Sequence, residues 1–567
     1  MSDIAPYSST RSHIFMLLLL TLAMVLPGLA SLPVIDRDEA RYVQASIQMV
    51  QTGDVMNIRF QDQARNKKPA GVYWLQSAAL KVFSNPDKRQ IWVHRLPSVL
   101  GALLAIFATY WGGAKLIGRD TAFVSAALLA ASLLFVFEAH IAKTDAILCG
   151  LSACVFAALG HLRHGTPASS RLPVWVFWIA LGGSMMIKGP ILLAILALTF
   201  IGFWLWNREL SWARPLLKPL PIFTFLLIWL PWAIGIYIVT DGAFFKESLG
   251  QDLGGKLISS QEKHPGPPGY HAALIWIMMW PASLFLLPAI ANGIRIFRAE
   301  KKQINASSEF KTLQLCVLWI LPFWVIIELM PTKLPHYSLP LYPAFCLMIG
   351  ASLSEVSHIR AFKRLRIANN VLFLLASAML FSALIYISFE HGQIAQKTTS
   401  LVIGAFASVA GLYAIFNITR GQIKPAFYSV ICAAMIISIG GYKLLLPELE
   451  TFNTSARIAQ ALDERLPRLQ DTTLLSPSYT EPSLVYHLGT NIELGLKTNP
   501  LDVSALKSGR ILLIDSLSGT QENLFNNIQT LAQDNHICLD ISEPISGFNY
   551  SKGDAVNIHI IQKKPCS

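Results

Sequence analysis

The chain has 567 residues, of which 53% are hydrophobic and only 14% charged, and its mean hydropathy is +0.47. Soluble domains carry about a quarter charged residues, so this composition excludes a soluble globular protein and indicates an integral membrane protein. The net charge of +12 becomes informative when it is divided by position, because membrane proteins concentrate their cations in cytoplasmic loops.

Thirteen apolar segments are long enough, or nearly long enough, to cross a bilayer. They are 13–33, 94–115, 120–137, 143–162, 172–187, 190–207, 219–240, 271–294, 312–330, 336–357, 367–389, 399–417 and 424–446. The segments within 172–207 are divided only by the polar break Lys188-Gly189-Pro190. The pattern predicts an α-helical polytopic membrane protein with about 13 transmembrane helices.

Alternate loops differ in charge, and the difference predicts orientation. One set is rich in cations, whereas the short loops of the other set hold mostly single ones, at Lys143, Lys188, Lys333 and Lys397. The richer set is cytoplasmic by the positive-inside rule, so 36–94, 241–270 and the tail after 447 lie outside. Residues 1–31 also have features of a cleavable signal, but twelve further spans follow them and anchoring needs no cleavage. In a bacterium this topology corresponds to the inner membrane, with these outer segments in the periplasm.

The outer segment 36–93 opens with the motif Asp38-Glu39-Ala40-Arg41-Tyr42. An amphipathic helix is predicted over 38–51, with Asp38, Arg41 and Tyr42 on one face. An apolar stripe of Val43, Ile47 and Val50 is expected to lie on the membrane, and a second amphipathic helix follows Pro69. Acids at a helix start often only stabilise its dipole. An acid, a base and a phenol at headgroup depth also suit chemistry on a lipid-borne phosphate.

Further polar residues are predicted on the same outer side. Lys67 and Lys68 can bind anionic headgroups or a specific phosphate. Asp145 opens the fourth span, and His264 lies in the loop 241–270, whose many Gly and Pro residues favour a mobile loop that closes over a ligand. Acids and a histidine on one side allow a divalent metal, although no ligand spacing requires one. The cofactor therefore stays unknown.

The long apolar segments stop before residue 448. This change divides the chain into a transmembrane domain, 1–447, and a small periplasmic α/β domain, 448–567. An amphipathic helix over 455–466 and helical stretches at 482–488 and 521–533 are predicted. The strand candidates are 473–475, 510–514, 537–541 and 555–561. Cys538 and Cys566 fall in this tail, where a disulfide could persist. The tail shows no nucleotide-binding loop and no catalytic motif.

Together these motifs resemble those of the GT-C membrane glycosyltransferases, in the branch of the lipid A aminoarabinose transferases and protein O-mannosyltransferases. In chain order they are Asp-Glu-x-Arg-Tyr (38–42), Gly-Asp (53–54), Lys-Pro-x-x-x-Tyr-Trp (68–74), Arg-x-Pro-Ser (95–98), the Asp at 145, Lys-Gly-Pro (188–190), Leu-Pro-Trp (230–232) and Lys-Leu-Pro-x-Tyr-x-x-Pro (333–340). Thirteen spans and an outer α/β tail resemble the aminoarabinose transferases in particular.

The resemblance implies a polyprenyl-phosphate sugar donor and transfer on the outer face of the membrane. The catalytic residues predicted on this basis are Asp38, Glu39 and Asp145. The predicted donor-phosphate ligands are Arg41 and Lys68, and the predicted cavity-lining residues are Tyr42, Tyr73, Lys333 and Tyr337. His264 sits where some relatives place a metal-associated histidine, but Lys67 stands where some of them have Glu.

The function predicted from the sequence is transfer of a sugar from a polyprenyl-phosphate donor to lipid A or another envelope glycolipid. One alternative is a protein O-mannosyltransferase, which has the same fold and a different acceptor. An alternative of another class is a lipid or sugar transporter or flippase, although transporters place their charges near the membrane midplane. A third, non-catalytic alternative is that the tail is a binding module and the rest of the chain is its scaffold. No nucleic-acid partner is expected.

Overall fold

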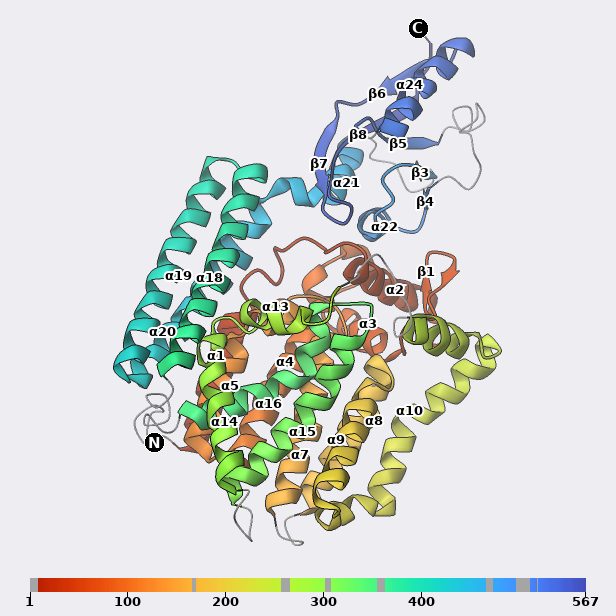
Figure 1. Cartoon of the computed structure of the whole chain (residues 1–567). Helices are drawn as coiled ribbons and strands as arrows, with labels where there is room; N and C mark the ends of the chain where they lie inside the picture. Colours follow the sequence, from red (N-terminus) through yellow and green to blue (C-terminus); the bar gives the residue numbers. More distant parts are fainter. Residues whose placement is uncertain are drawn as a thin grey trace.

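A computed structural model describes residues 9–165, 170–255, 266–300, 307–353, 363–465, 473–495, 510–517 and 519–566. Figure 1 shows a body of long helices and, beyond one end of it, a smaller domain of strands and helices built from the C-terminal residues. The prediction of a polytopic helical membrane protein with a C-terminal domain containing a β-sheet is confirmed. The division at residues 447 and 448 remains a prediction.

Within the described residues, eight helical segments are long and apolar enough to cross a membrane. They are α4 (Ile91–Leu116), α7 (Asp145–His164), α10 (Pro219–Thr240), Ala282–Ala299 with α14 (Leu286–Glu300), α15 (Ser308–Leu329), α18 (Lys363–His391), α19 (Ile394–Arg420) and Ile423–Glu448 with α20 (Ile423–Ile437) and η7 (Ser438–Leu445). A ninth span results if α5 (Arg119–Ala131) and α6 (Leu133–Ala139), which are bent by 64° at their junction, cross together.

The other predicted spans also contain helices, but these are shorter or less apolar. They are α1 (Thr10–Val25), α8 (Arg171–Lys188), α9 (Ile191–Asn207) and α16 (Tyr342–Leu353). The predicted span 336–357, for example, begins in a 3-10 segment, η6 (Pro335–Leu341), and not in an α-helix. Hydropathy detects an apolar run of residues, but it does not detect a helix break inside that run.

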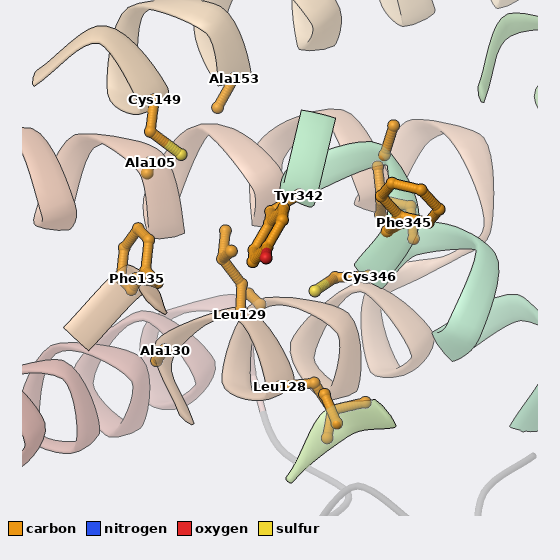
Figure 2. Close-up of a cluster of buried hydrophobic side chains, with 14 of the residues drawn as sticks. Ala105, Leu128, Leu129, Ala130, Phe135, Cys149, Ala153, Tyr342, Phe345 and Cys346 are labelled. Atoms are coloured by element: carbon orange, nitrogen blue, oxygen red, sulfur yellow. The ribbon is translucent and has the colours of Figure 1, made fainter. Parts of the chain in front are cut away.

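The centre of the helical body is a cluster of small and aromatic side chains. Figure 2 shows α4, α5, α7 and α16 meeting there, with Ala105, Leu129, Cys149, Tyr342 and Cys346 turned toward one another. A Cβ added at Gly101 of α4 would lie 2.6 Å from the Ile147 Cα of α7. The two backbones therefore touch, as small residues allow in membrane helix pairs. This contact fixes the outer ends of α4 and α7 relative to each other.

The outer segment forms α2 (Asp38–Thr52), a two-stranded ribbon of β1 (Arg59–Phe60) and β2 (Gln63–Ala64), α3 (Gly71–Phe83) and the 3-10 turn η1 (Pro86–Lys88). The helix predicted over 38–51 is present, but its expected position on the membrane is wrong. Val43 and Ile47 are buried in a protein cluster with Val93 and Tyr486. An amphipathic stripe has the same pattern whether lipid or protein covers it. Here the C-terminal domain and α4 provide the cover.

The C-terminal domain has a mixed sheet in the order β4-β3-β5-β8-β6, with β7 also paired to β8. The strands are β3 (Leu474–Ser476), β4 (Ile492–Leu494), β5 (Ile511–Asp515), β6 (Leu539–Ile541), β7 (Ile545–Asn549) and β8 (Asp554–Lys563). β3 is parallel to β4 and β5, and the pairs made by β8 are antiparallel. The helices are α21 (Thr454–Arg465), α22 (Pro482–Leu488) and α24 (Gly519–Asp534), and Cys538 is bonded to Cys566.

Four of these strands overlap the predicted ones, whereas β4 and β7 were not predicted. β4 has only three residues, and β7 contains Gly547 at its centre. Gly interrupts the alternation of polar and apolar residues by which strands are recognised. A side chain at position 547 would collide with Thr454, since an added Cβ would lie 2.1 Å from its Oγ1. The glycine therefore allows β7 to pack closely against α21.

Candidate active site

Two cavities meet at the start of α2. The smaller cavity, of about 360 Å³, runs between α2, α7, α8 and α15. The larger cavity, of about 1610 Å³, extends from the same place to the C-terminal domain. The residues that line both are Asp38, Arg65, Lys67, Lys143, Leu334 and His336. A molecule in either cavity can therefore reach Asp38.

Asp38 is the first residue of α2, and its carboxylate is exposed toward the cavities. The Arg65 Nη2 lies 3.8 Å from its Oδ1. Burial within the fold opposes ionisation of Asp38, but the charges of Lys143 and Arg65 outweigh burial and lower its pKa below the ordinary value. Asp38 is consequently a carboxylate at neutral pH, able to accept a hydrogen bond or a proton.

Glu39, the next residue, has a different environment. Its side chain has no exposed surface and receives two hydrogen bonds of 2.9 Å from the Arg95 guanidinium of α4. The backbone N–H groups of Ile35 and Ala142 donate to the same carboxylate, at 2.8 and 2.7 Å. Glu39 thus joins α2, α4 and the loop before α7. The structure places this predicted catalytic residue in a buried ion pair behind Asp38.

Asp145 is the first residue of α7 and lies in a buried cluster of charged groups. Its Oδ1 is 2.5 Å from Lys188 Nζ, and its Oδ2 is 3.8 Å from Lys143 Nζ. Two further members, Glu138 and His336, were not among the residues predicted from the sequence. Lys143 lies 3.4 Å from Glu138 Oε2, while His336 lies between Glu138 and Asp145, at 3.7 and 3.9 Å.

Three of these side chains could offer ligand atoms to a metal. Atoms of Glu138, Asp145 and His336 all lie within 4.8 Å of one another. Lys143 and Lys188 already balance the two carboxylates, so the cluster is neutral without an added cation. A divalent ion would have to displace both ammonium groups, and the arrangement therefore fits an ion-pair network better than a metal centre. The predicted metal-associated residue, His264, lies outside the described residues.

The two predicted phosphate ligands lie on different cavities. Lys68 lines the smaller cavity, where its Nζ is 2.5 Å from the Asp252 carboxylate of η4 (Lys246–Gly254). Arg41 lines the larger cavity. Their joint role around one phosphate therefore remains a prediction. Lys188 is on the same cavity as Lys68, although only its presence in the Lys-Gly-Pro turn pointed to it in the sequence.

Of the four predicted cavity-lining residues, two line the smaller cavity and two line neither of these cavities. Tyr42 and Tyr337 line the smaller cavity. Tyr73 is fully buried behind Tyr42, at a ring separation of 5.2 Å, and accepts a 3.2 Å hydrogen bond from Arg65. Lys333 is 3% exposed and donates to the backbone carbonyls of Ile327 and Glu328.

Tyr42 lies one helical turn after Asp38 in α2. Burial, followed by Tyr73 and Asp38, raises the pKa of its phenol well above the ordinary value. The Arg65 guanidinium lies 5.2 Å from the centre of the Tyr42 ring. The Tyr42 hydroxyl therefore stays protonated and can donate to a ligand in the smaller cavity.

Comparison with known proteins identifies the class of protein that has this architecture. Residues 67–234 match the sequence profile of the dolichyl-phosphate-mannose-protein mannosyltransferase family. The fold is similar to that of ArnT from Cupriavidus metallidurans bound to undecaprenyl phosphate, with a TM-score of 0.75, 17% identity and 98% of each chain covered. It is also similar to an oligosaccharyltransferase from Archaeoglobus fulgidus, with a TM-score of 0.51 and 12% identity over 94% of this chain and 69% of that one. The chain has the fold of the GT-C membrane glycosyltransferases, as its motifs predicted.

Among curated proteins, the similarity is to one kind of transferase. The undecaprenyl phosphate-alpha-4-amino-4-deoxy-L-arabinose arabinosyl transferase of Pseudomonas aeruginosa strain LESB58 is 25% identical over 409 residues, which are 70% of each chain. The protein of the same name from Erwinia tasmaniensis is 24% identical over 55% of this chain and 54% of its own. The resemblance to the aminoarabinose transferases inferred from the motifs is thereby confirmed.

Proposed function

We propose that this protein is an inner-membrane glycosyltransferase that moves 4-amino-4-deoxy-L-arabinose from undecaprenyl phosphate to lipid A or another envelope glycolipid. The observation that supports this most directly is the meeting of two unlike cavities at Asp38. A transferase for two lipid-borne substrates needs two binding sites that share one reactive carboxylate. The names of the similar proteins supply the donor and the sugar.

The smaller cavity suits the donor. Lys68, Lys188 and Tyr337 lie among its polar lining residues, and Ile191, Phe323, Ile326, Ile327 and Met330 form an apolar part of its wall. Ammonium groups beside an apolar channel match a phosphate on a long isoprenoid chain. Lys68 and Lys188 would stabilise the charge that develops on the phosphate as its bond to the sugar breaks.

The larger cavity suits an amphiphilic acceptor. Its polar lining carries charges of both signs, among which the cations Arg37, Arg41 and Lys552 can pair with acceptor phosphates. Leu380, Leu384, Ile437 and Leu446 form an apolar side. Its volume of about 1610 Å³ exceeds that of most small-molecule sites, as a glycolipid requires. Lys552 belongs to the C-terminal domain, which therefore contributes directly to the wall of the cavity.

The reaction would be a single displacement at the anomeric carbon. The bond between this carbon and the donor phosphate oxygen breaks while an acceptor oxygen forms the new bond, which inverts the configuration. Asp38 orients the acceptor and takes its proton if the acceptor is a hydroxyl group. If the acceptor is a phosphate, it is already anionic and Asp38 has only to orient it. The carrier leaves as undecaprenyl phosphate.

We place the reaction on the periplasmic face, since the segments predicted to lie outside, opposite the cation-rich short loops, carry Asp38, Lys68 and Asp145. About 13 helices would then cross or enter the membrane. Protein O-mannosyl transfer remains the second candidate, favoured by the family matched over 67–234. The similar proteins are transferases, which leaves the transporter alternative without support.

The experiment that tests the function is transfer by the purified protein in detergent or vesicles. Undecaprenyl phosphate-aminoarabinose and lipid A are supplied, and mass spectrometry follows the products. A lipid A species heavier by one aminopentose residue is the expected product. Mannose on a protein acceptor, with unmodified lipid A, would support the O-mannosyltransferase instead.

Lys68→Ala is expected to lower kcat/KM for the donor by about 10²-fold, because one cation that neutralises the leaving phosphate is lost. The rate at low donor concentration is the measurement. Asp252→Asn is the matched variant, since it removes the carboxylate that pairs with Lys68 and keeps the ammonium group. Asp252→Asn should use the donor as the wild type does. Equal rates for Lys68→Ala and the wild type would contradict the phosphate role.

Lys552→Glu is expected to raise KM for an anionic acceptor by about tenfold and to leave KM for the donor unchanged. The physical reason is repulsion between the new carboxylate and the acceptor phosphates, which salt should weaken. Lys564→Glu is the control, because Lys564 is an exposed residue of the same domain. If both variants had the same KM for lipid A, the larger cavity would not be the acceptor site.

A further inference from the structure

The residue before Asp38 has an unusual backbone conformation. Arg37 has φ 69° and ψ −84°, in a region that residues with a Cβ rarely adopt. Such conformations persist only where surrounding contacts hold them, and they cluster at active sites. The direction in which α2 presents Asp38 is set by this turn.

The contacts that hold the turn come from the C-terminal domain. The backbone N–H of Ser483 donates to Asp36 Oδ1 at 2.9 Å, and the Tyr550 hydroxyl accepts a hydrogen bond from the Asp36 N–H. The Glu481 carboxylate lies 3.8 Å from the Arg37 guanidinium. The start of α22 and the turn between β7 and β8 therefore hold two consecutive residues directly before Asp38.

Glu481 is itself firmly placed. It is 3% exposed, and its second oxygen accepts a 3.0 Å hydrogen bond from the Asn549 side chain. Asn549 ends β7, and Tyr550 follows it in the turn to β8. Glu481, which contacts Arg37, is thus hydrogen-bonded to the end of β7. The next residue after that strand is Tyr550, which contacts Asp36.

The rest of α2 is also covered by this domain, as the position of α22 above α2 in Figure 1 shows. Tyr486 of α22 packs in the cluster that contains Val43 and Ile47, and its hydroxyl bonds the Arg89 carbonyl. The domain consequently contacts the turn before the helix and the apolar side of the helix. Asp36, Arg37 and Glu481 line the larger cavity together with Asp38, whereas Tyr486 does not.

We propose that the C-terminal domain is a working part of the active site, in which Glu481, Ser483 and Tyr550 are positioning residues that hold the Asp36–Arg37 turn and so aim Asp38 at the junction of the two cavities. This inference rests on the proposed role of Asp38. It assigns to the domain a function for which its sequence shows no motif.

The test uses the full-length protein with two substitutions at the same position. Arg37→Gly and Arg37→Val both remove the guanidinium, but only Gly tolerates a φ near 69°. We expect kcat of Arg37→Val to fall at least tenfold below that of Arg37→Gly, with KM for the donor similar in both. Equal kcat values for the two variants would overturn the proposal.

Glu481→Gln combined with Tyr550→Phe provides the independent measurement. We expect kcat to fall at least tenfold and the backbone amides of 36–40 to exchange hydrogen faster, while Arg465→Gln, a surface change within the domain, alters neither. An unchanged kcat in the folded double variant would overturn the proposal, whether or not exchange rises. Asp38→Asn is assayed alongside. If Asp38→Asn is inactive and the double variant is fully active, only the positioning role fails, whereas an active Asp38→Asn would refute the role of Asp38 on which this inference rests. The absence of sugar transfer by the wild type would refute the proposed function itself.

Discussion

Replacing Asp38 with Asn is expected to lower the initial rate of sugar transfer by about 10³-fold, within the range found for the loss of a general base. Asn has nearly the same shape and can still donate or accept a hydrogen bond, but it has no charge and cannot take a proton. Asp38 is ionised because Lys143 and Arg65 lower its pKa. The substitution therefore removes the one negative charge that faces both cavities at their junction and leaves the surrounding cations in place.

The measurement is product formation at saturating donor and acceptor, with the amount of folded protein determined by size-exclusion chromatography. Asp87→Asn is the matched control, because Asp87 is an exposed acid of the same outer segment. It should transfer at the normal rate. Turnover by Asp38→Asn within about twofold of the wild type would refute the assignment of the reaction centre.

Glu39→Ala is expected to have its largest effect on folding. Removing one partner of a buried ion pair leaves the other charge uncompensated and typically costs about 3–5 kcal/mol. Here Arg95 would lose both of its bonds to Glu39, and the N–H groups of Ile35 and Ala142 would lose their acceptor. Because these bonds join α2 to α4, we expect the protein to be less stable and Asp38 to be displaced.

Heat or denaturant unfolding in detergent is the measurement, followed by transfer assays on whatever folded protein remains. Glu39→Gln keeps the length and one carbonyl acceptor, so it should lose less stability than Glu39→Ala. Glu493→Ala breaks an exposed pair with Arg510 and is expected to change stability by less than about 1 kcal/mol. A normal unfolding midpoint for Glu39→Ala would contradict the structural role of this pair.

The sequence predicted most of the helices because a bilayer demands long apolar runs, and such runs are visible in any one segment. It also identified Asp38 and Lys68 as candidates from local motifs. It did not identify Glu138 or His336. Their proximity to Asp145 depends on the bend between α5 and α6 and on a 3-10 segment almost 200 residues further along the chain. Local sequence patterns do not reveal contacts between residues that are so far apart in the chain.

The environment of α2 illustrates a second limit. Its apolar stripe was assigned to the membrane, yet the partner that covers it includes Tyr486, more than 400 residues away. Hydrophobic periodicity reports that a face is removed from water, and it does not report what replaces the water. The same ambiguity applies to Arg41 and Lys68. Their charge suggested a common phosphate, whereas the fold separates them onto two cavities.

The ion pair between Lys68 and Asp252 has a consequence for the catalytic cycle. An ammonium group near the membrane would be costly to leave without a counter-ion, and the carboxylate of η4 supplies one between turnovers. Arrival of a donor phosphate would then exchange one anion for another, and departure of the carrier would reverse that exchange. The charge around Lys68 would stay nearly constant through the cycle. Product release would be assisted by a side chain that competes for the same cation.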